Sequence, residues 1–167
     1  MNKSNIVLIG MPGSGKSTVG VVLAKEAILD FVDTDVLIQN REQCSLQSIV
    51  DTQGHEVLKQ IEEEVIVETI FENQVVATGG SAAYSPRSMA HLKQNSTLVF
   101  LNVSLENLKL RIKNFTTRGI AKGPNQSFEE LFDERYTLYS KYADVVIECD
   151  GTTVEEVVEK ILESNER

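Results

Sequence analysis

The strongest structural signal in this chain is the stretch Gly10-Met11-Pro12-Gly13-Ser14-Gly15-Lys16-Ser17. It matches the pattern G-x-x-x-x-G-K-[ST] at every fixed position. The apolar run Ile6–Ile9 precedes it, and a pattern of helical period follows it. Glycines let backbone N–H groups turn inward around phosphate oxygens, and the start of a helix adds the positive end of its dipole. The alternative is a chance glycine turn before a helix, which the complete match disfavours. The stretch therefore predicts a nucleoside triphosphate site.

Each part of this stretch has a distinct expected contact with the triphosphate. Lys16 would reach the β- and γ-phosphates, and the Ser17 hydroxyl would ligate Mg²⁺. A nucleoside triphosphate and Mg²⁺ are therefore the expected cofactors. We expect contacts with the nucleotide from Gly13, Ser14, Gly15, Lys16, Ser17 and Thr18.

Outward from this stretch, short apolar runs alternate with longer segments of helical period. This alternation is typical of an α/β fold with a parallel sheet, whose strands are covered on both faces. The predicted strands are Ile6–Ile9, Phe31–Val32, Val75–Ala77, Leu98–Leu101 and Val145–Ile147. The predicted helices span about 16–27, 56–72, 86–94, 105–113, 128–142 and 153–163, with one or two shorter helices between 36 and 51. We therefore expect a three-layer α/β/α P-loop NTPase fold around a five-stranded parallel sheet.

Two segments depart from this alternation. Residues 114–126 lack apolar periodicity and hold two glycines and a proline, so we expect a mobile lid there. Residues 36–55 contain no strand pattern and follow the second strand. We expect them, with the start of the next helix, to form a helical flap over about 36–62 that binds the acceptor.

Composition excludes several classes of protein. The chain has 167 residues, 41% hydrophobic and 25% charged, which suits one folded domain over residues 1–167. Its net charge of −9 disfavours nucleic-acid binding, which needs a basic face. No signal-peptide core or membrane-spanning run is present in the sequence, and the two cysteines have no metal-ligand or disulfide pattern. We expect a cytoplasmic monomer without a membrane partner.

The second predicted strand ends in Asp33-Thr34-Asp35, where a parallel sheet places its ligand crevice. Carboxylates two residues apart on an extended segment project to the same side. One carboxylate would assist Mg²⁺, while the other would contact an acceptor hydroxyl. The alternative is that Asp35 only caps the following helix.

These motifs, in this order, resemble those of the shikimate kinases, within the nucleoside-monophosphate-kinase-like branch of P-loop proteins. The resemblance spans nearly the whole chain and implies phosphoryl transfer from ATP to shikimate. Its residues are Gly10–Thr18, Asp33-Thr34-Asp35, Gly54–Glu62, Thr78-Gly79-Gly80, Leu110-Arg111, Arg118, and Arg135 with Leu138-Tyr139.

The resemblance also implies a role for each matching residue. Lys16, Asp35 and Arg118 would be catalytic, with Asp35 accepting a hydrogen bond from the acceptor hydroxyl and acting as its base. Ser17 and Asp33 would hold Mg²⁺. The implied ligand contacts are Gly79, Gly80, Lys59 and Arg135 on the acceptor, Arg118 on the phosphates when the lid closes, and Arg111 stacked on adenine.

Several of these residues have structural alternatives. Arg111 stands near two lysines and is alternatively part of a solvated basic face. Arg135 has glutamates within helical reach and alternatively forms ordinary surface ion pairs. We interpret Glu62–Glu64 as a solvated face, although Glu62 falls where the family has a carboxylate that braces an arginine. The tyrosines at positions 84, 136 and 139 are interpreted as packing residues.

Departures from the family pattern fall on the acceptor side and in the lid, while the ATP side is intact. Lys59 replaces an arginine, Leu58 an aromatic residue, Ser81 a glycine and Gly119 a proline. The planar guanidinium of arginine binds a carboxylate with two parallel hydrogen bonds, whereas the lysine ammonium is a point charge on a flexible side chain. The departures indicate a retuned shikimate pocket or a different acceptor.

The leading hypothesis is an ATP-dependent kinase of shikimate, a small anionic polyol. One alternative keeps the chemistry with another small hydroxy acid or polyol as acceptor. The other is an ATP-binding regulatory module without catalysis, which has little need of both Asp35 and Arg135. A nucleoside-monophosphate kinase is disfavoured, because the acidic 33–35 segment would face a second nucleotide's phosphate.

Overall fold

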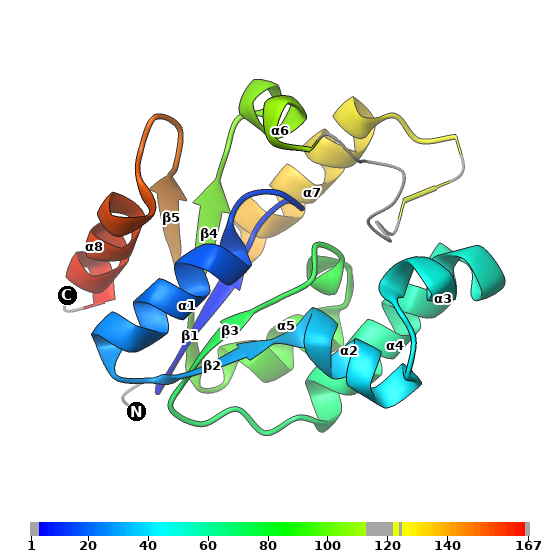
Figure 1. The fold of residues 1–167 in the computed structure, drawn as a ribbon, viewed down its shortest axis with the longest axis horizontal. Coiled ribbons are helices and arrows are strands. Elements are labelled where there is room, and N and C mark those ends of the chain that lie inside the picture. Colours follow the sequence, from blue (N-terminus) through cyan, green and yellow to red (C-terminus); the bar gives the residue numbers. More distant parts are fainter. Residues whose placement is uncertain (1–3, 113–121, 124, 166–167) are drawn as a thin grey trace.

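The computed structural model describes residues 4–112, 122–123 and 125–165, in which strands and helices alternate along the chain (Figure 1). The strands are β1 (Asn5–Ile9), β2 (Asp30–Asp33), β3 (Gln74–Ala77), β4 (Ser96–Asn102) and β5 (Val145–Glu148). The helices are α1 (Lys16–Ala27), α2 (Thr34–Glu42), α3 (Leu46–Gln53), α4 (His55–Glu68), the short 3₁₀ helix η1 (Ala82–Tyr84), α5 (Pro86–Lys93), α6 (Leu105–Arg111), α7 (Phe128–Tyr142) and α8 (Val154–Asn165). The five predicted strands are confirmed.

The five strands form one parallel sheet in the order β2-β3-β1-β4-β5. β1 is central, with β3 on one side and β4 on the other. Because all strands run the same way, the segments that leave β1, β2 and β3 start from one edge of the sheet. These segments are the glycine-rich loop, residues 33–35 and residues 78–81, so the topology brings the predicted site residues together.

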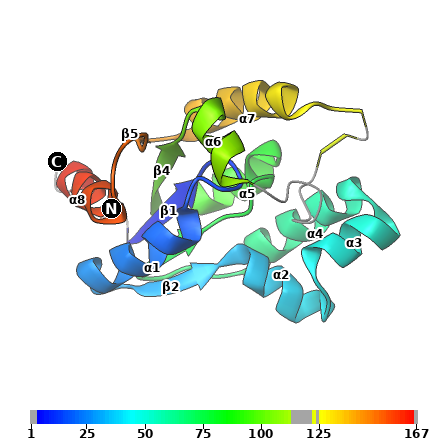
Figure 2. The ribbon, with the colours of Figure 1, turned by 45° about the horizontal axis from the view of Figure 1, so that its top comes forward.

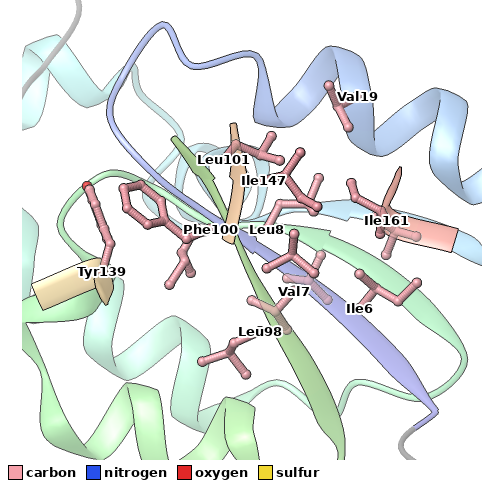
Figure 3. Packing of buried hydrophobic residues seen from close by; sticks show 14 of the residues in the cluster. Ile6, Val7, Leu8, Val19, Leu98, Phe100, Leu101, Tyr139, Ile147 and Ile161 are labelled. Carbon is pink, nitrogen blue, oxygen red and sulfur yellow. The ribbon is translucent and has the colours of Figure 1, made fainter. Parts of the chain in front are cut away.

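Helices cover both faces of this sheet and make three layers (Figure 2). α1 and α8 pack together on one face, and α5 and α7 cover the other. Figure 3 shows Val19 of α1 and Ile161 of α8 on one side of the central strands, with Tyr139 of α7 on the other side beside Phe100. β1 is buried along its whole length because it is covered on both faces, which explains the apolar run Ile6–Ile9. The predicted α/β/α layering is confirmed.

The predicted flap over about 36–62 consists of α2, α3 and the first half of α4 (Figure 1). It has its own small apolar cluster, separate from the main core. The members are Ile38, Ile49, Leu58, Ile61 and Val65. The flap is therefore a packed unit beside the sheet, and its inner side lies next to the carboxyl ends of β2 and β3.

The predicted helix over 56–72 is wrong at its C-terminal end. α4 ends at Glu68, and Thr69 has an extended backbone. The N–H and the hydroxyl of Thr69 both bond to Val65 O, which closes the last turn. The carbonyl of Phe71 then accepts a hydrogen bond of 2.8 Å from the Asn5 side chain, which directs the chain into β3. The apolar pair Ile70-Phe71 continues the helical period of the sequence, although it belongs to the connection between α4 and β3.

Most of the predicted lid at 114–126, with Arg118 and Gly119, lies outside the described residues. Within the described ranges, no helix is long and apolar enough to cross a membrane.

Candidate active site

The loop between β1 and α1 has the backbone of a phosphate cradle. Gly10, Gly13 and Gly15 all have positive φ angles, and α1 begins directly after Gly15. A side chain at Gly10 would lie 2.9 Å from Leu101 O, so this position also needs glycine for space. The first N–H groups of α1 have no intrahelical acceptor, and they face the same hollow as the loop.

Lys16 lies within this loop. Its Nζ donates to Gly10 O at 2.7 Å and to Met11 O at 2.9 Å, and the residue is only 8% exposed. Burial lowers the pKa of Lys16 to about 8, against the opposing pull of Asp35 and Asp33. The ammonium is therefore held where the loop would close around phosphates.

Ser17 and Asp33 meet at the mouth of the loop. The Ser17 hydroxyl donates to Asp33 Oδ2 at 2.5 Å, while Asp33 Oδ1 accepts the backbone N–H of Asp35 at 2.9 Å. Asp33 is thus the N-cap of α2. The alternative role of Asp35 as the cap of this helix is wrong, because Asp33 caps α2. The Asp35 side chain is therefore available to contact a ligand.

The Asp35 carboxylate lies at the centre of the site. Burial raises the pKa of Asp35 to about 6, with a further rise from the charge of Asp33. The same carboxylate lies near Lys16, which opposes this rise. Near neutral pH the group remains mostly ionised, with a proton affinity higher than that of an ordinary aspartate. This is the property of a general base.

Gly79 and Gly80 need to be glycines for reasons of space. A side chain at Gly79 would collide with Glu62, and one at Gly80 would collide with Arg135. The backbone is fixed on both sides: Gly79 N–H donates to Thr34 Oγ1 at 3.0 Å, and the Tyr139 hydroxyl donates to Gly80 O at 2.6 Å. Tyr139 therefore supports the site as well as the core.

Glu62 corrects the sequence interpretation. It is only 3% exposed, and the buried Ser81 hydroxyl donates a hydrogen bond to its Oε2. Burial raises the pKa of Glu62 to about 7; the bond from Ser81 lowers it, and the charge of Asp35 raises it. Helical spacing was the missed signal, because Glu62 is four residues after Leu58 and three before Val65, both buried.

Arg135 is buried, with 1% exposure, and its guanidinium lies close to Gly80. The alternative of ordinary surface ion pairs is wrong. The neighbouring carboxylates have other partners: Glu129 pairs with Lys109, Glu130 completes the capping box of α7, and Glu134 accepts from Tyr84.

Lys59 and Arg111 lie at two different margins of the site. Arg111 is exposed, lines the larger hollow beside the loop, and its Nη1 is 3.5 Å from Gly13 O. Lys59 lines neither hollow of the site. Its Nζ lies 3.3 Å from Glu56 Oε1 and 4.3 Å from the centre of the Tyr84 ring.

Two adjoining hollows lie along this edge of the sheet. The larger, about 510 Å³, is lined by the loop, the start of α1 and Arg111. The smaller, about 30 Å³, is lined by Glu62, Ser81, Arg135 and apolar side chains of the flap. Pro12, Asp35, Gly79 and Gly80 line both. A phosphate cradle and a small polar pocket that share one partly buried carboxylate define a P-loop kinase of small molecules.

Comparison with known proteins supplies the family. The family model described as shikimate kinase matches residues 12–166. The chain therefore belongs to the shikimate kinase family. A shikimate kinase of Sulfurihydrogenibium sp. is 36% identical over 159 residues, which is 95% of each chain. One of Francisella tularensis subsp. novicida is 38% identical over 161 residues, 94% of this chain and 92% of that protein.

Solved structures agree with this assignment. A shikimate kinase from Acinetobacter baumannii in complex with shikimate has a TM-score of 0.88 and 29% identity, covering 96% of this chain and 92% of its own. The shikimate kinase of Aquifex aeolicus has a TM-score of 0.82 and 35% identity, covering 97% and 96% respectively.

Proposed function

We propose that this chain transfers the γ-phosphoryl group of ATP to a hydroxyl of shikimate, giving shikimate 3-phosphate, as a single kinase domain and a cytoplasmic monomer. The observation that carries the proposal is the place of Asp35, a partly buried carboxylate that lines both the phosphate cradle and a small pocket that contains a buried arginine. The complex of a related enzyme with shikimate supports the choice of acceptor.

The chemistry of the residues that line the smaller hollow suits a small carboxylated polyol. Arg135 supplies a charged fork for a carboxylate, with Lys59 as a second cation at the margin. Glu62 and Asp35 supply acceptors for hydroxyl groups. Because Gly79 and Gly80 carry no side chains, Glu62 and Arg135 can lie directly against the backbone beside this hollow.

Catalysis would rest on position and charge. The acceptor hydroxyl donates its proton to Asp35 as its oxygen attacks the γ-phosphorus, and the bond from that phosphorus to the β-γ bridging oxygen breaks. Lys16 would move from the loop carbonyls to the phosphate oxygens and stabilise the charge that develops there. Arg111 would lie against the adenine, and Arg118 would approach the phosphates from the lid.

The donor set at the mouth of the loop fits Mg²⁺. Ser17 and Asp33 present a hydroxyl and a carboxylate, which are hard oxygen ligands, already 2.5 Å apart. Within the described ranges, no group of three His, Cys, Asp or Glu side chains is placed to hold a metal. A magnesium ion here would therefore take further ligands from phosphates and water, as is common for nucleotide sites, and would neutralise phosphate charge.

The test is coupled ADP release with ATP and Mg²⁺, with and without shikimate. We expect strong stimulation by shikimate in the wild-type protein and loss of that stimulation in the Asp35→Asn variant. Asp51→Asn, an exposed aspartate of α3, is the matched control and should behave as wild type. A response to another hydroxy acid but not to shikimate would contradict the acceptor. ATP binding without stimulation by any acceptor would contradict the kinase itself.

A further inference from the structure

Tyr84 occupies a position that its interpretation as a packing residue does not explain. It ends η1, the short helix after Gly79-Gly80, and η1 contacts both α4 and α7. α4 carries Lys59 and α7 carries Arg135. The Tyr84 side chain therefore lies between the two helices that supply the cations of the acceptor site.

The Lys59 ammonium lies over the face of this ring, 4.3 Å from its centre. An ammonium at this distance is attracted to the negative face of the aromatic ring. Glu56, one helical turn earlier, holds the same Nζ at 3.3 Å from the other side. A flexible lysine stem is thus restrained by two contacts, one of them aromatic.

The Arg135 guanidinium lies over the same ring, with its central carbon 5.5 Å from the ring centre. The ring is itself anchored, because the Tyr84 hydroxyl donates to Glu134, whose other carboxylate oxygen accepts from Gln126 at 3.2 Å. Burial raises the pKa of the Tyr84 phenol, so the hydroxyl keeps its proton for this bond. One anchored ring therefore contacts both cations.

We propose that Tyr84 is a positioning residue that holds Lys59 and Arg135 so that both face the acceptor carboxylate. This inference rests on the proposed function. Arginine binds a carboxylate with two parallel hydrogen bonds from a planar group, which fixes the orientation of the pair. A lysine ammonium has no such planar group, so a neighbouring residue must restrain its position for the carboxylate to be held as firmly. The Tyr84 ring supplies that restraint and allows a lysine to serve at position 59.

The first test compares three variants in steady-state kinetics with shikimate. In Tyr84→Leu we expect the KM for shikimate to rise about fivefold, with kcat and the KM for ATP within about twofold of wild type. Tyr84→Phe keeps the ring face but loses the hydroxyl bond to Glu134 that anchors the ring, so its rise in the KM for shikimate should be smaller than that of Tyr84→Leu. Tyr136→Leu is the matched control. The Tyr136 ring lies on α7, the helix that carries Arg135, but it packs on Phe132 and Phe100, so the KM for shikimate should not change.

Two further readouts separate positioning from a general structural effect. The Tyr84→Leu effect should shrink in a Lys59→Met background, because the ring then has one cation fewer to hold. It should also be absent with the methyl ester of shikimate, measured as kcat/KM, since the ester lacks the negative charge that the two cations bind.

An unchanged shikimate KM in Tyr84→Leu would overturn the inference while leaving the proposed function intact. Equal losses with the acid and the ester, or a matching rise in the KM for ATP, would overturn it as well, because they indicate a distorted pocket. Absence of shikimate turnover in the wild-type protein would instead overturn the proposed function, and the inference with it.

Discussion

Replacing Glu62 with glutamine should stabilise the protein at alkaline pH and leave it almost unchanged in acid. Glu62 is buried, and its surroundings raise its pKa from 4.5 to about 7. Between these two values the folded state binds more protons than the unfolded state, so the stability of the wild-type protein falls as pH rises through this interval. Glutamine is close to the protonated acid in shape and carries no charge, so the variant escapes this loss.

The size of the effect follows from the two pKa values. The shift corresponds to about 3 kcal/mol of unfolding free energy at pH 8, at about 1.4 kcal/mol per pKa unit, and to under about 1 kcal/mol at pH 5. For a chain of this length, each kcal/mol changes the melting temperature by about 2–4 °C. Glu62→Gln should therefore melt roughly 6–12 °C above wild type at pH 8.

Thermal unfolding followed by circular dichroism at pH 5 and pH 8 measures this difference. Glu72→Gln removes an exposed carboxylate after α4 and is the matched control, with no expected change in the pH dependence. A Glu62→Gln variant that is no more stable than wild type at pH 8 would refute the reasoning. It would mean that the bond from Ser81 and the nearby cations fully offset the burial of the charge.

Four other outcomes are expected. Lys16→Ala should lower phosphoryl transfer at least about a thousandfold in the ADP-release assay, and residual activity near wild type would remove Lys16 from the mechanism. The kcat/KM for shikimate should rise with pH through about 6 as Asp35 ionises, and a flat profile from pH 5 to 7 would argue against that base. Lys59→Arg should lower the KM for shikimate by restoring a fork, whereas no improvement, with activity on another acid, would favour a different acceptor. Gly80→Ala should raise that KM about tenfold or more, because the new methyl group displaces Arg135; wild-type kinetics would show that the pocket yields easily.

The fold follows from local signals in the sequence. The glycine-rich loop fixes one strand and one helix, and short apolar runs reveal the other strands. The inner strands β3 and β4 are buried, whereas the edge strands β2 and β5 are only partly covered, contrary to the expectation of strands covered on both faces. The place of Asp33 and Asp35 in the site can also be predicted from the sequence. They follow a predicted strand, and the carboxyl ends of parallel strands lie at the same edge of the sheet. A helix boundary depends on single hydrogen bonds, such as those of Thr69 with Val65, and apolar periodicity does not carry that information.

Other site residues depend on contacts between distant segments. The run of three glutamates at 62–64 is typical of a charged surface, whereas the burial of Glu62 depends on how α4 packs against α5 and η1. The Tyr84 ring contacts both Lys59 and Arg135, which belong to separate helices. No local pattern distinguishes such a ring from an ordinary core residue.

The rest position of Lys16 has a consequence for heat measurements. Its ammonium donates to the carbonyls of Gly10 and Met11, and with a pKa of about 8 roughly half of the protein molecules lack that proton at pH 8. A triphosphate that takes the place of the two carbonyls would favour the charged form of Lys16. The neutral fraction of Lys16 would then take up a proton, and the buffer would release that proton. The calorimetric enthalpy of nucleotide binding would then include the ionisation enthalpy of the buffer and would differ between Tris and phosphate at the same pH. Nucleotide binding at this loop would in this way include the uptake of a proton by Lys16, so the affinity for the nucleotide would depend on pH.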